Sequence, residues 1–183
     1  LDDMMHHLRR KYYVALLSAA SYHGASHQVP LQFSVMIELP AMRDKKGEKY
    51  LTHYFCKTHI PEAYVERRQT RTGYINVSCP ELTAVDLLTY QAKTGSVSRA
   101  ATVLSELAEK LDFGRLGADF VKEVSVTSLQ RLGYILDEVL EEGEAAESVY
   151  SLLKCSDIVL QYVPLKTGKS SEGCERNAKW RVI

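Results

Sequence analysis

Residues 12–28 read YYVALLSAASYHGASHQ, and this stretch predicts a helix with a defined end. Its apolar and small residues recur at helical spacing, and one face would comprise Leu16, Leu17, Ala20 and then His23 or Gly24. Alanines and serines on the other faces would let neighbouring elements approach closely. A glycine at position 24 can adopt the left-handed conformation that closes a helix without a Cβ clash. The stretch contains no obvious catalytic constellation.

A small β region is expected after this helix. Apolar residues from Leu31 to Ile37 alternate with Gln32, Ser34 and Met36, which is the period of a half-buried strand. Residues 50–57 predict a second strand. Because the charged segment 40–49 contains Gly47 and is typical of a hairpin loop, we expect the two strands to pair antiparallel. Residues 74–78 predict a third strand, with Ile75 and Val77 facing inward.

Helices are expected to follow the third strand. In the sequence SCPE, Ser78 can cap a helix, Pro80 fits its first turn and Glu81 can close a capping box. The buried stripe of that helix would be Leu82, Val85, Leu88 and Thr89. The next helix, with Ser96 as its cap, has the clearest apolar stripe: Val97, Ala100, Ala101, Leu104, Leu107, Ala108 and Leu111.

Further helices are predicted around residues 116–124, 129–139 and 144–154, and two strands over residues 158–163 and 179–183. A Gly/Ser/Lys-rich loop, residues 166–177, separates these two strands. The predicted fold class is therefore α+β, with a small mixed or antiparallel sheet packed against a helical layer.

The composition is that of an ordinary globular domain. With 183 residues, 45% of them hydrophobic and 25% charged, the chain is long enough to bury a core as one domain, residues 1–183. Four widely spaced cysteines form no C-x-x-C pair, so we expect reduced thiols. We find no apolar run of membrane-spanning length and no signal peptide, and we expect a cytoplasmic protein without membrane contact.

The net charge of zero conceals two regions of opposite sign. Residues 43–71 carry eight Lys or Arg and four Asp or Glu, a net charge of +4. Residues 106–147 carry four basic and eleven acidic residues, a net charge of −7. Such a separation can orient a polyanion or an oppositely charged protein surface.

Candidate catalytic motifs are incomplete. His53, Cys56 and His59 have a metal-like spacing, but positions 53 and 56 of a strand face opposite ways. The loop KTGKSS, residues 166–171, lacks the first glycine of a phosphate-binding loop. A nuclease centre would need a carboxylate near Lys57, for which Glu38 is the sole candidate. We therefore expect no catalytic, cofactor-binding or metal-binding residues, and no enzyme activity.

Five segments carry a family resemblance: residues 12–28, SCPELTAVDLLTY (78–90), SRAATVLSELAEKLD (98–112), LQRLGYILD (129–137) and RNAKWRVI (176–183). In this order they resemble the AbiEi-type antitoxins of bacterial toxin–antitoxin and phage abortive-infection operons. The resemblance implies an antitoxin that neutralises a nucleotidyltransferase-like toxin and represses its own operon by binding operator DNA.

In that family a winged helix-turn-helix domain usually precedes this region. Nothing in residues 1–183 looks like one, and the chain begins at Leu1, so we expect the C-terminal antitoxin domain without its N-terminal partner. The toxins' nucleotidyltransferase chemistry is not expected here. Gly95 and Ser96 open a helix as in that fold, but no Asp-x-Asp pair follows to hold two metal ions.

The candidate contact residues are mostly basic. Several occur in what we interpret as a short connection between two strands, and the full set is Lys57, His59, Arg67, Arg68, Arg71 and Arg99. Arginine presents a planar fork suited to phosphate or carboxylate, so contact with operator DNA or an acidic toxin face is the functional interpretation. Solvated surface charge is the alternative. For Arg99, the alternative to a partner contact is a structural ion pair with Asp86.

Two functions remain open at this point. One is the antitoxin domain, and the other is a domain of a DNA-binding transcriptional regulator without a toxin partner. A toxin gene directly downstream would favour the first, and an orphan gene the second.

Overall fold

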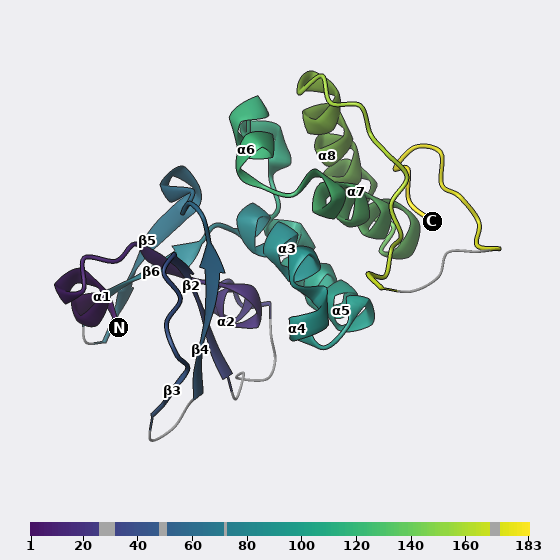
Figure 1. The fold of residues 1–183 in the computed structure, drawn as a ribbon. Coiled ribbons are helices and arrows are strands. Elements are labelled where there is room, and N and C mark those ends of the chain that lie inside the picture. Colours follow the sequence, from purple (N-terminus) through teal and green to yellow (C-terminus); the bar gives the residue numbers. More distant parts are fainter. Residues whose placement is uncertain (26–31, 48–50, 72, 169–172) are drawn as a thin grey trace. The chain divides into compact units, whose positions relative to one another are not determined.

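The computed structural model describes residues 1–25, 32–47, 51–71, 73–168 and 173–183 (Figure 1). These residues form two compact units, 1–83 and 84–183, and the boundary falls within one helix. The first unit holds a sheet with two helices and the second is helical, so the predicted α+β class is confirmed.

The first unit is built on a mixed six-stranded sheet with the strand order β3-β4-β2-β1-β6-β5. The strands are β1 Tyr12–Val14, β2 Gln32–Glu38, β3 Lys45–Lys46, β4 Leu51–Lys57, β5 Val65–Thr70 and β6 Gly73–Ser78. Strand β1 pairs antiparallel with β2 and parallel with β6. The helices are α1 Asp2–His7 and α2 Leu16–Tyr22, with a short turn η1 over Glu62–Tyr64.

The described part of the stretch 12–28 contains two elements. Residues Leu16–Tyr22 form the predicted helix, and Gly24 has a positive φ of 75°, which confirms the helix and its glycine end. The prediction is wrong for Tyr12–Val14, which form a strand buried on both faces. Aromatic and β-branched side chains favour that conformation, and the neighbouring strands β2 and β6 supply the pairing.

The pairing of β2 with β4 differs from the prediction. The two strands run parallel, in register from Gln32 opposite Leu51 to Glu38 opposite Lys57. The predicted hairpin loop contains β3, and β3 pairs antiparallel with β4. Strand β2 is also more buried than predicted, because Val35, Met36 and Ile37 are all inaccessible at the sheet centre. Residues 31 and 50 lie outside the described part of the chain.

The core of the first unit joins the central strands to both helices. Its cluster of buried residues includes Tyr12, Val14, Val35, Ile37, Ile75 and Val77, with Met5 from α1 and Ala19 from α2. The inward positions predicted for Ile75 and Val77 are confirmed. The Tyr12 hydroxyl donates a hydrogen bond to Asp2 (2.7 Å) and accepts one from the Asn76 backbone N–H (3.3 Å). The bond to Asp2 fastens α1 to the sheet, and the bond from Asn76 adds to the pairing of β1 with β6.

The described helices from residue 80 onward mostly agree with the sequence pattern. They are α3 Pro80–Thr89, α4 Gln91–Thr94, α5 Val97–Leu107, α6 Ala118–Glu123, α7 Val126–Tyr134 and α8 Gly143–Cys155. Single turns lie at Ala108–Lys110, Phe113–Arg115 and, as a π-turn, Ile135–Val139. The predicted cap of α5 is confirmed, since Ser96 Oγ accepts from the Arg99 N–H at 3.3 Å.

The start of α3 differs from the prediction. Cys79 directly precedes the helix, and its Sγ accepts from the Leu82 N–H at 3.4 Å. Ser78, the predicted cap, hydrogen-bonds the Val14 carbonyl and the Thr83 hydroxyl instead. The predicted burial of Leu82, Val85 and Leu88 is confirmed, whereas Thr89 is exposed.

The two strands predicted near the end of the chain are not formed. Val163 and Asn177 each make an isolated bridge to Val182, and the described residues around them are irregular. A different set of contacts holds the C-terminal segment, the described part of residues 158–183, to α7. Gln130 Nε2 donates to the backbone carbonyls of Gln161 (2.8 Å) and Trp180 (2.9 Å). The Trp180 side chain is fully buried.

Asp137 completes this attachment. Its Oδ2 accepts from Trp180 Nε1 at 2.8 Å and from Lys179 Nζ at 2.9 Å. The hydrogen bonds from Lys179 and then Trp180 hold the pKa of Asp137 below its ordinary value of 3.8, against the opposing effect of burial. Because the pKa is lowered on folding, the carboxylate stabilises the fold above pH 3.8, and this contribution is lost as the pH falls through the lowered pKa.

We therefore expect Asp137→Asn to lower the free energy of unfolding by about 1 kcal/mol at pH 7 and by less near pH 3. The fluorescence of Trp180, the sole tryptophan in the chain, follows the unfolding. Asp119→Asn is the matched control, because Asp119 is exposed and contacts Lys122 on the surface of α6. If the free energy of unfolding depended on pH in the same way in wild type and in Asp137→Asn, the stabilising role assigned to the Asp137 carboxylate would be wrong.

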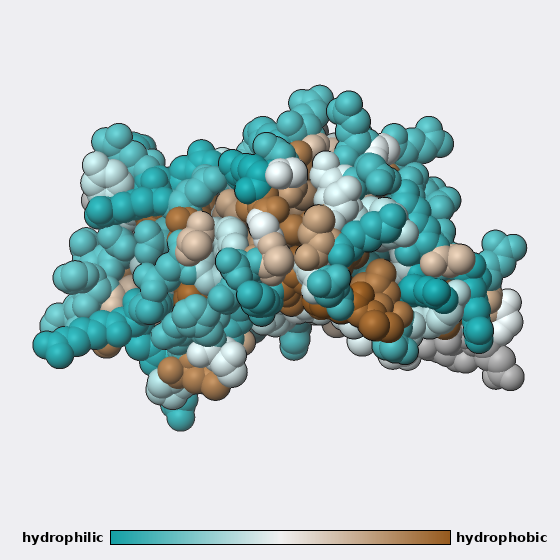
Figure 2. All heavy atoms as spheres, turned by 90° about the horizontal axis from the view of Figure 1, so that it is seen from above, coloured by the Kyte–Doolittle hydropathy of each residue, from teal (hydrophilic) through white to brown (hydrophobic). Residues whose placement is uncertain are grey.

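Among the described residues, none of the helices has both the length and the apolar character needed to cross a bilayer. Hydrophilic residues cover most of the face drawn in Figure 2, and hydrophobic residues appear there in limited patches.

Candidate partner-binding surface

The candidate arginines lie on and beside an edge strand, where a connection was predicted. Strand β5 is the last in the sheet order, and β6 is its neighbour. In the register, Arg67 lies opposite Asn76 and Arg68 lies opposite the buried Ile75. Because successive strand residues point to opposite faces, Arg67 and Arg68 do not share a surface. The expectation of one surface holding Arg67, Arg68 and Arg71 is therefore corrected.

Arg67 and Arg71 are available to a partner. Arg67 is exposed, and its guanidinium carbon lies 4.3 Å from the centre of the Tyr74 ring on β6. Tyr74 is the diagonal cross-strand neighbour of Arg67 and is itself 48% exposed. Arg71, in the turn that follows β5, is also exposed. Two exposed cations and a tyrosine ring thus belong to one hairpin.

Arg68 has a different environment. Its Nε and Nη2 donate to Glu66 Oε2 at 3.0 and 2.7 Å, and Nη2 also lies 3.2 Å from His23 Nδ1. A guanidinium can only donate, so Nδ1 accepts and the His23 proton resides on Nε2, which donates to the Ser78 carbonyl at 2.7 Å. His23 is buried at 3% exposure, and Arg68 thereby links β5 to the end of α2.

The prediction that His23 hydrogen-bonds at a helix exit is confirmed. The sequence did not indicate its partner Arg68, which lies 45 positions away. His27, the other histidine of that prediction, lies outside the described residues.

Lys57 and His59 lie far from the arginines. Strand β4 is separated from β5 by β2, β1 and β6, which corresponds to about 19 Å across the sheet at the usual strand spacing. Lys57 Nζ lies 5.5 Å from the centre of the Tyr13 ring. His59 Nδ1 lies 3.6 Å from Glu38 Oε1. The predicted basic segment therefore forms at least two separate groups.

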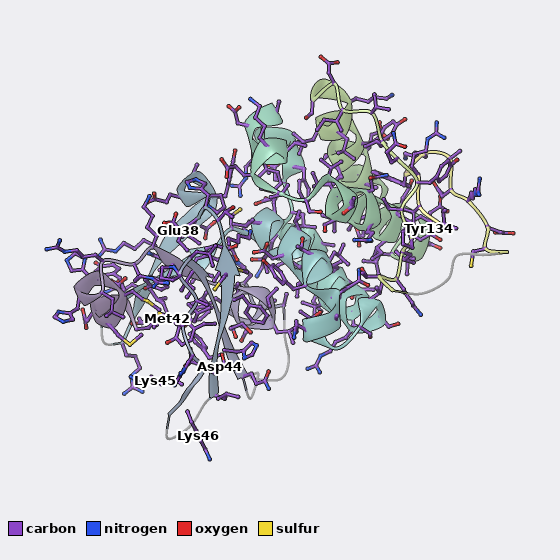
Figure 3. The ribbon with its side chains drawn as sticks, in the orientation of Figure 1. Glu38, Met42, Asp44, Lys45, Lys46 and Tyr134 are labelled. Atoms are coloured by element: carbon purple, nitrogen blue, oxygen red, sulfur yellow. The ribbon has the colours of Figure 1, made fainter. Side chains whose placement is uncertain are left out.

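The end of β2 and β4 does place Glu38 opposite Lys57, the pair that a nuclease centre would need. However, Glu38 Oε1 accepts a hydrogen bond from the Ile60 N–H at 3.1 Å, and its backbone carbonyl accepts one from Arg10 at 2.7 Å. Figure 3 shows Glu38 at this end of β2. The carboxylate therefore has a structural partner.

The histidine and cysteine spacing noted in the sequence does not make a cluster. His53 Nδ1 pairs with Asp44 Oδ2 at 2.5 Å, and Cys56 packs against the core on the other face of β4. Among the residues that the structure describes, no three His, Cys, Asp or Glu side chains are placed to hold a metal ion. Burial raises the pKa of the Cys79 thiol to about 12, which disfavours a nucleophilic thiolate.

Arg99 and Asp86 have different surroundings within the second unit. Asp86 is 1% exposed on α3, whereas Arg99 is exposed on the first turn of α5. The Arg99 side chain lies over Gly95, whose φ of 107° turns the chain into α5. Arg99 remains a candidate contact residue that lies apart from β5 in the chain.

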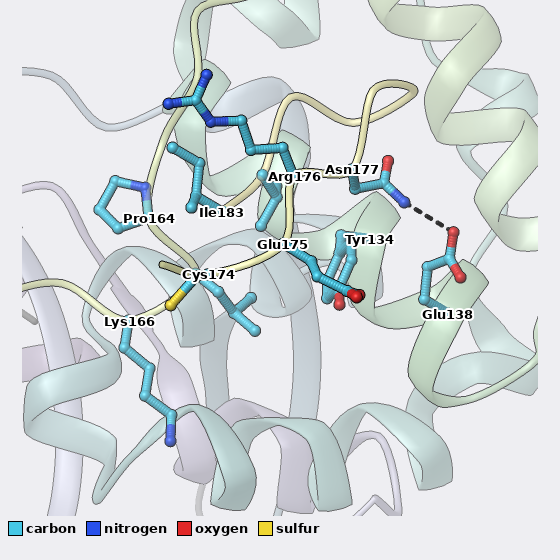
Figure 4. A pocket seen from close by; sticks show the side chains of 11 residues that line it. Tyr134, Glu138, Pro164, Lys166, Cys174, Glu175, Arg176, Asn177 and Ile183 are labelled. Atoms are coloured by element: carbon cyan, nitrogen blue, oxygen red, sulfur yellow. Dashed lines mark hydrogen bonds between the residues drawn. The ribbon is translucent and has the colours of Figure 1, made fainter. Parts of the chain in front are cut away.

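A cavity of about 460 Å³, which the sequence did not predict, lies in the second unit between α7 and the C-terminal segment. Tyr134, Glu138, Lys166 and Arg176 are among its lining residues (Figure 4). Asn177 Nδ2 donates to Glu138 Oε1 at 2.8 Å across one side of it. This bond adds to the contacts that hold the C-terminal segment.

Comparison with known proteins places this fold in a class of antitoxin domains. The profile of the AbiEi antitoxin C-terminal domain matches residues 13–138, more than two thirds of the chain. The chain belongs to the AbiEi antitoxin C-terminal domain family, as the sequence resemblance predicted. The segment RNAKWRVI, residues 176–183, lies outside the matched region. This is a non-enzymatic family, and its antitoxin role implies a toxin partner in general.

The fold is also similar to a solved structure, that of the RV2827C protein from Mycobacterium tuberculosis, with a TM-score of 0.65 at 17% sequence identity. The alignment covers 93% of this chain and 61% of that protein, so this chain spans about three fifths of its length. At this identity the similarity concerns the fold alone. A search of curated proteins finds no match.

Proposed function

We propose that this chain is the antitoxin domain of a bacterial toxin–antitoxin or abortive-infection system. In this proposal it neutralises a nucleotidyltransferase-like toxin in the cytoplasm and, within a full-length protein that has an N-terminal winged helix-turn-helix domain, supports repression of its own operon. The observation that carries the proposal is the family match over residues 13–138.

The charge distribution supports contact with an anionic partner through the first unit. Residues 1–83 carry eleven Lys or Arg and eight Asp or Glu, a net charge of +3. Residues 84–183 carry twelve Lys or Arg and fifteen Asp or Glu, a net charge of −3. Arg67 and Arg71 project from one hairpin, where their guanidinium groups can donate to phosphate or carboxylate. We assign them as the contacts with operator DNA or an acidic toxin face, and Arg68 as a positioning residue.

Co-expression tests the antitoxin function. The neighbouring toxin gene is induced in bacteria with and without this chain, and viable colonies are counted. Rescue of growth by the chain is the expected result. Failure to rescue, together with retained operator binding by the full-length protein, would instead assign the chain to a transcriptional regulator without a toxin partner.

The variant Arg67→Ala/Arg71→Ala tests the contact surface. In the full-length protein we expect weaker operator binding, with a salt dependence flattened by up to about two units of log–log slope, because each lost phosphate contact removes one released counterion. Fluorescence anisotropy across a salt series measures both quantities. Folding should change little, since exposed charges contribute little to stability.

Lys45→Ala/Lys46→Ala is the matched control, because these two exposed lysines lie on β3 at the other edge of the sheet (Figure 3). Equal loss of affinity in both variants would show a general charge effect. If Arg67→Ala/Arg71→Ala bound operator DNA with unchanged affinity and salt dependence, the two arginines would not contact DNA. If this variant also rescued cells from the toxin as well as the wild type does, the two arginines would be solvated surface charges without a partner role.

A further inference from the structure

A second basic region lies at the end of the chain, within the otherwise acidic second unit. Residues 84–147 carry six Lys or Arg and twelve Asp or Glu. Residues 148–183 carry six Lys or Arg and only three Asp or Glu. The sign of the charge therefore reverses along this unit. The described basic residues of the second stretch are Lys154, Lys166, Arg176, Lys179 and Arg181.

Two arginines from separate positions of the C-terminal segment converge on one tyrosine. The guanidinium carbon of Arg181 lies 5.0 Å from the centre of the Tyr162 ring, and that of Arg176 lies 5.4 Å from it. Both arginines are exposed, and Tyr162 is 37% exposed. Planar cations and an aromatic ring are thus presented together to solvent.

A second tyrosine lies beside this group. Lys154 Nζ lies 4.4 Å and Lys179 Nζ 5.3 Å from the centre of the Tyr150 ring on α8. Tyr150, Lys154, Lys179 and Arg181 also line one hollow of about 270 Å³, which includes Val159 at 80% exposure. Arg181 contacts Tyr162 and lines the hollow, so the two groups are continuous.

The backbone beneath this surface is held in place. The Val163 N–H donates to the Arg181 carbonyl at 2.9 Å, and the Ile183 N–H donates to the Val163 carbonyl at 2.9 Å. Gln130 and the buried Trp180 attach the same segment to α7. The rings and cations therefore sit on an ordered support, which reduces the entropy lost when a ligand binds.

We propose that this surface, formed by Tyr150, Lys154, Tyr162, Arg176, Lys179 and Arg181, binds single-stranded nucleic acid. Lys154, Arg176 and Arg181 contact phosphates, and bases stack on Tyr162 and on the outer planes of the guanidinium groups. Lys179 is already paired with Asp137 at 2.9 Å and with Glu147 at 3.6 Å, so it supports the Tyr150 side of the surface. Val159 supplies apolar contact. An acidic peptide would use the charges alone, whereas here each of two tyrosine rings lies beside two cations, a combination of ring and charge that is typical of single-strand binding. The site is distinct from the β5 hairpin and does not rest on the antitoxin proposal.

The test uses this chain with a fluorescein-labelled oligothymidylate of about twelve nucleotides, within the usual range of single-strand sites. Anisotropy is recorded over a salt series. We expect salt-dependent binding by the wild type. Arg176→Ala/Arg181→Ala should weaken it about tenfold or more and reduce the log–log slope by up to about 1.4. Tyr162→Ala should weaken it at least fivefold, and Tyr162→Phe should retain it, because the ring is preserved.

Lys122→Ala is the control, since Lys122 is an exposed lysine of the acidic stretch. Trp180 fluorescence verifies that each variant is folded, and where Tyr162→Ala is not, Tyr162→Leu replaces it. Three results would overturn the proposal: no wild-type binding at low salt, equal binding by Tyr162→Leu and Tyr162→Phe, or displacement of the oligonucleotide by polyglutamate as effective as that by unlabelled oligothymidylate. Toxin rescue is measured separately, so either proposal can fail alone.

Discussion

Replacing Gly133 with alanine is expected to displace Trp180 and destabilise the second unit by about 3 kcal/mol. Gly133 lies on α7, and an added Cβ would come within 1.9 Å of Trp180 Cζ3. Real Cβ contacts never approach so closely, and the indole is fully buried, so the ring must leave its site or α7 must shift. Overpacking of this kind costs 1–3 kcal/mol or more in proteins.

Trp180 reports this change directly. We expect its emission to shift to longer wavelength as the indole meets water, and the urea midpoint of this signal to fall. Gly143→Ala is the matched control, because nothing lies within 4 Å of its added Cβ at the start of α8. An unchanged emission spectrum and midpoint in Gly133→Ala would contradict the packing of Trp180 on α7.

Truncation of Tyr12 is expected to have the largest effect in the first unit. The ring belongs to the buried cluster of the sheet, and its hydroxyl bonds Asp2 and the Asn76 backbone. Tyr12→Ala should therefore lower the free energy of unfolding by about 3–5 kcal/mol, as for other large buried aromatic residues. Tyr12→Phe, which loses the hydrogen bonds but keeps the ring, should cost about 1 kcal/mol.

Tyr74→Ala provides the comparison within the same sheet. Tyr74 is 48% exposed on β6 and stacks with Arg67, so we expect a loss below about 1 kcal/mol. Urea unfolding followed by far-ultraviolet circular dichroism measures the series. If Tyr12→Ala and Tyr74→Ala had equal free energies of unfolding, the placement of Tyr12 in the buried core of the sheet would be wrong.

The sequence predicted the elements whose signals are local. Ser96 is the cap of α5, Gly24 ends α2 with a positive φ, and the alternation around Ile75 and Val77 marks a strand. Each of these signals involves residues within one or two turns, so no distant contact is needed to decide it. The family followed from segments spread along the whole chain.

The candidate site was predicted less well. The sequence identified Arg67, Arg68 and Arg71 as a basic group, but it did not show that they lie on and beside a strand. In the strand, Arg68 bonds Glu66 and His23, while Arg67 stacks on Tyr74. The aromatic and basic surface around Tyr162 was not predicted, because its residues come from three segments brought together by folding.

By itself, then, the sequence determined the α+β class, most helix positions and membership in the AbiEi family. Tertiary structure decided that β2 and β4 run parallel, that Tyr12–Val14 form a strand, and that Trp180 packs on Gly133. The physical reason is the same for all three. Periodicity and capping are set by neighbours in the chain, whereas strand direction and side-chain partners depend on residues tens of positions away, whose pairing is fixed when the whole core is packed.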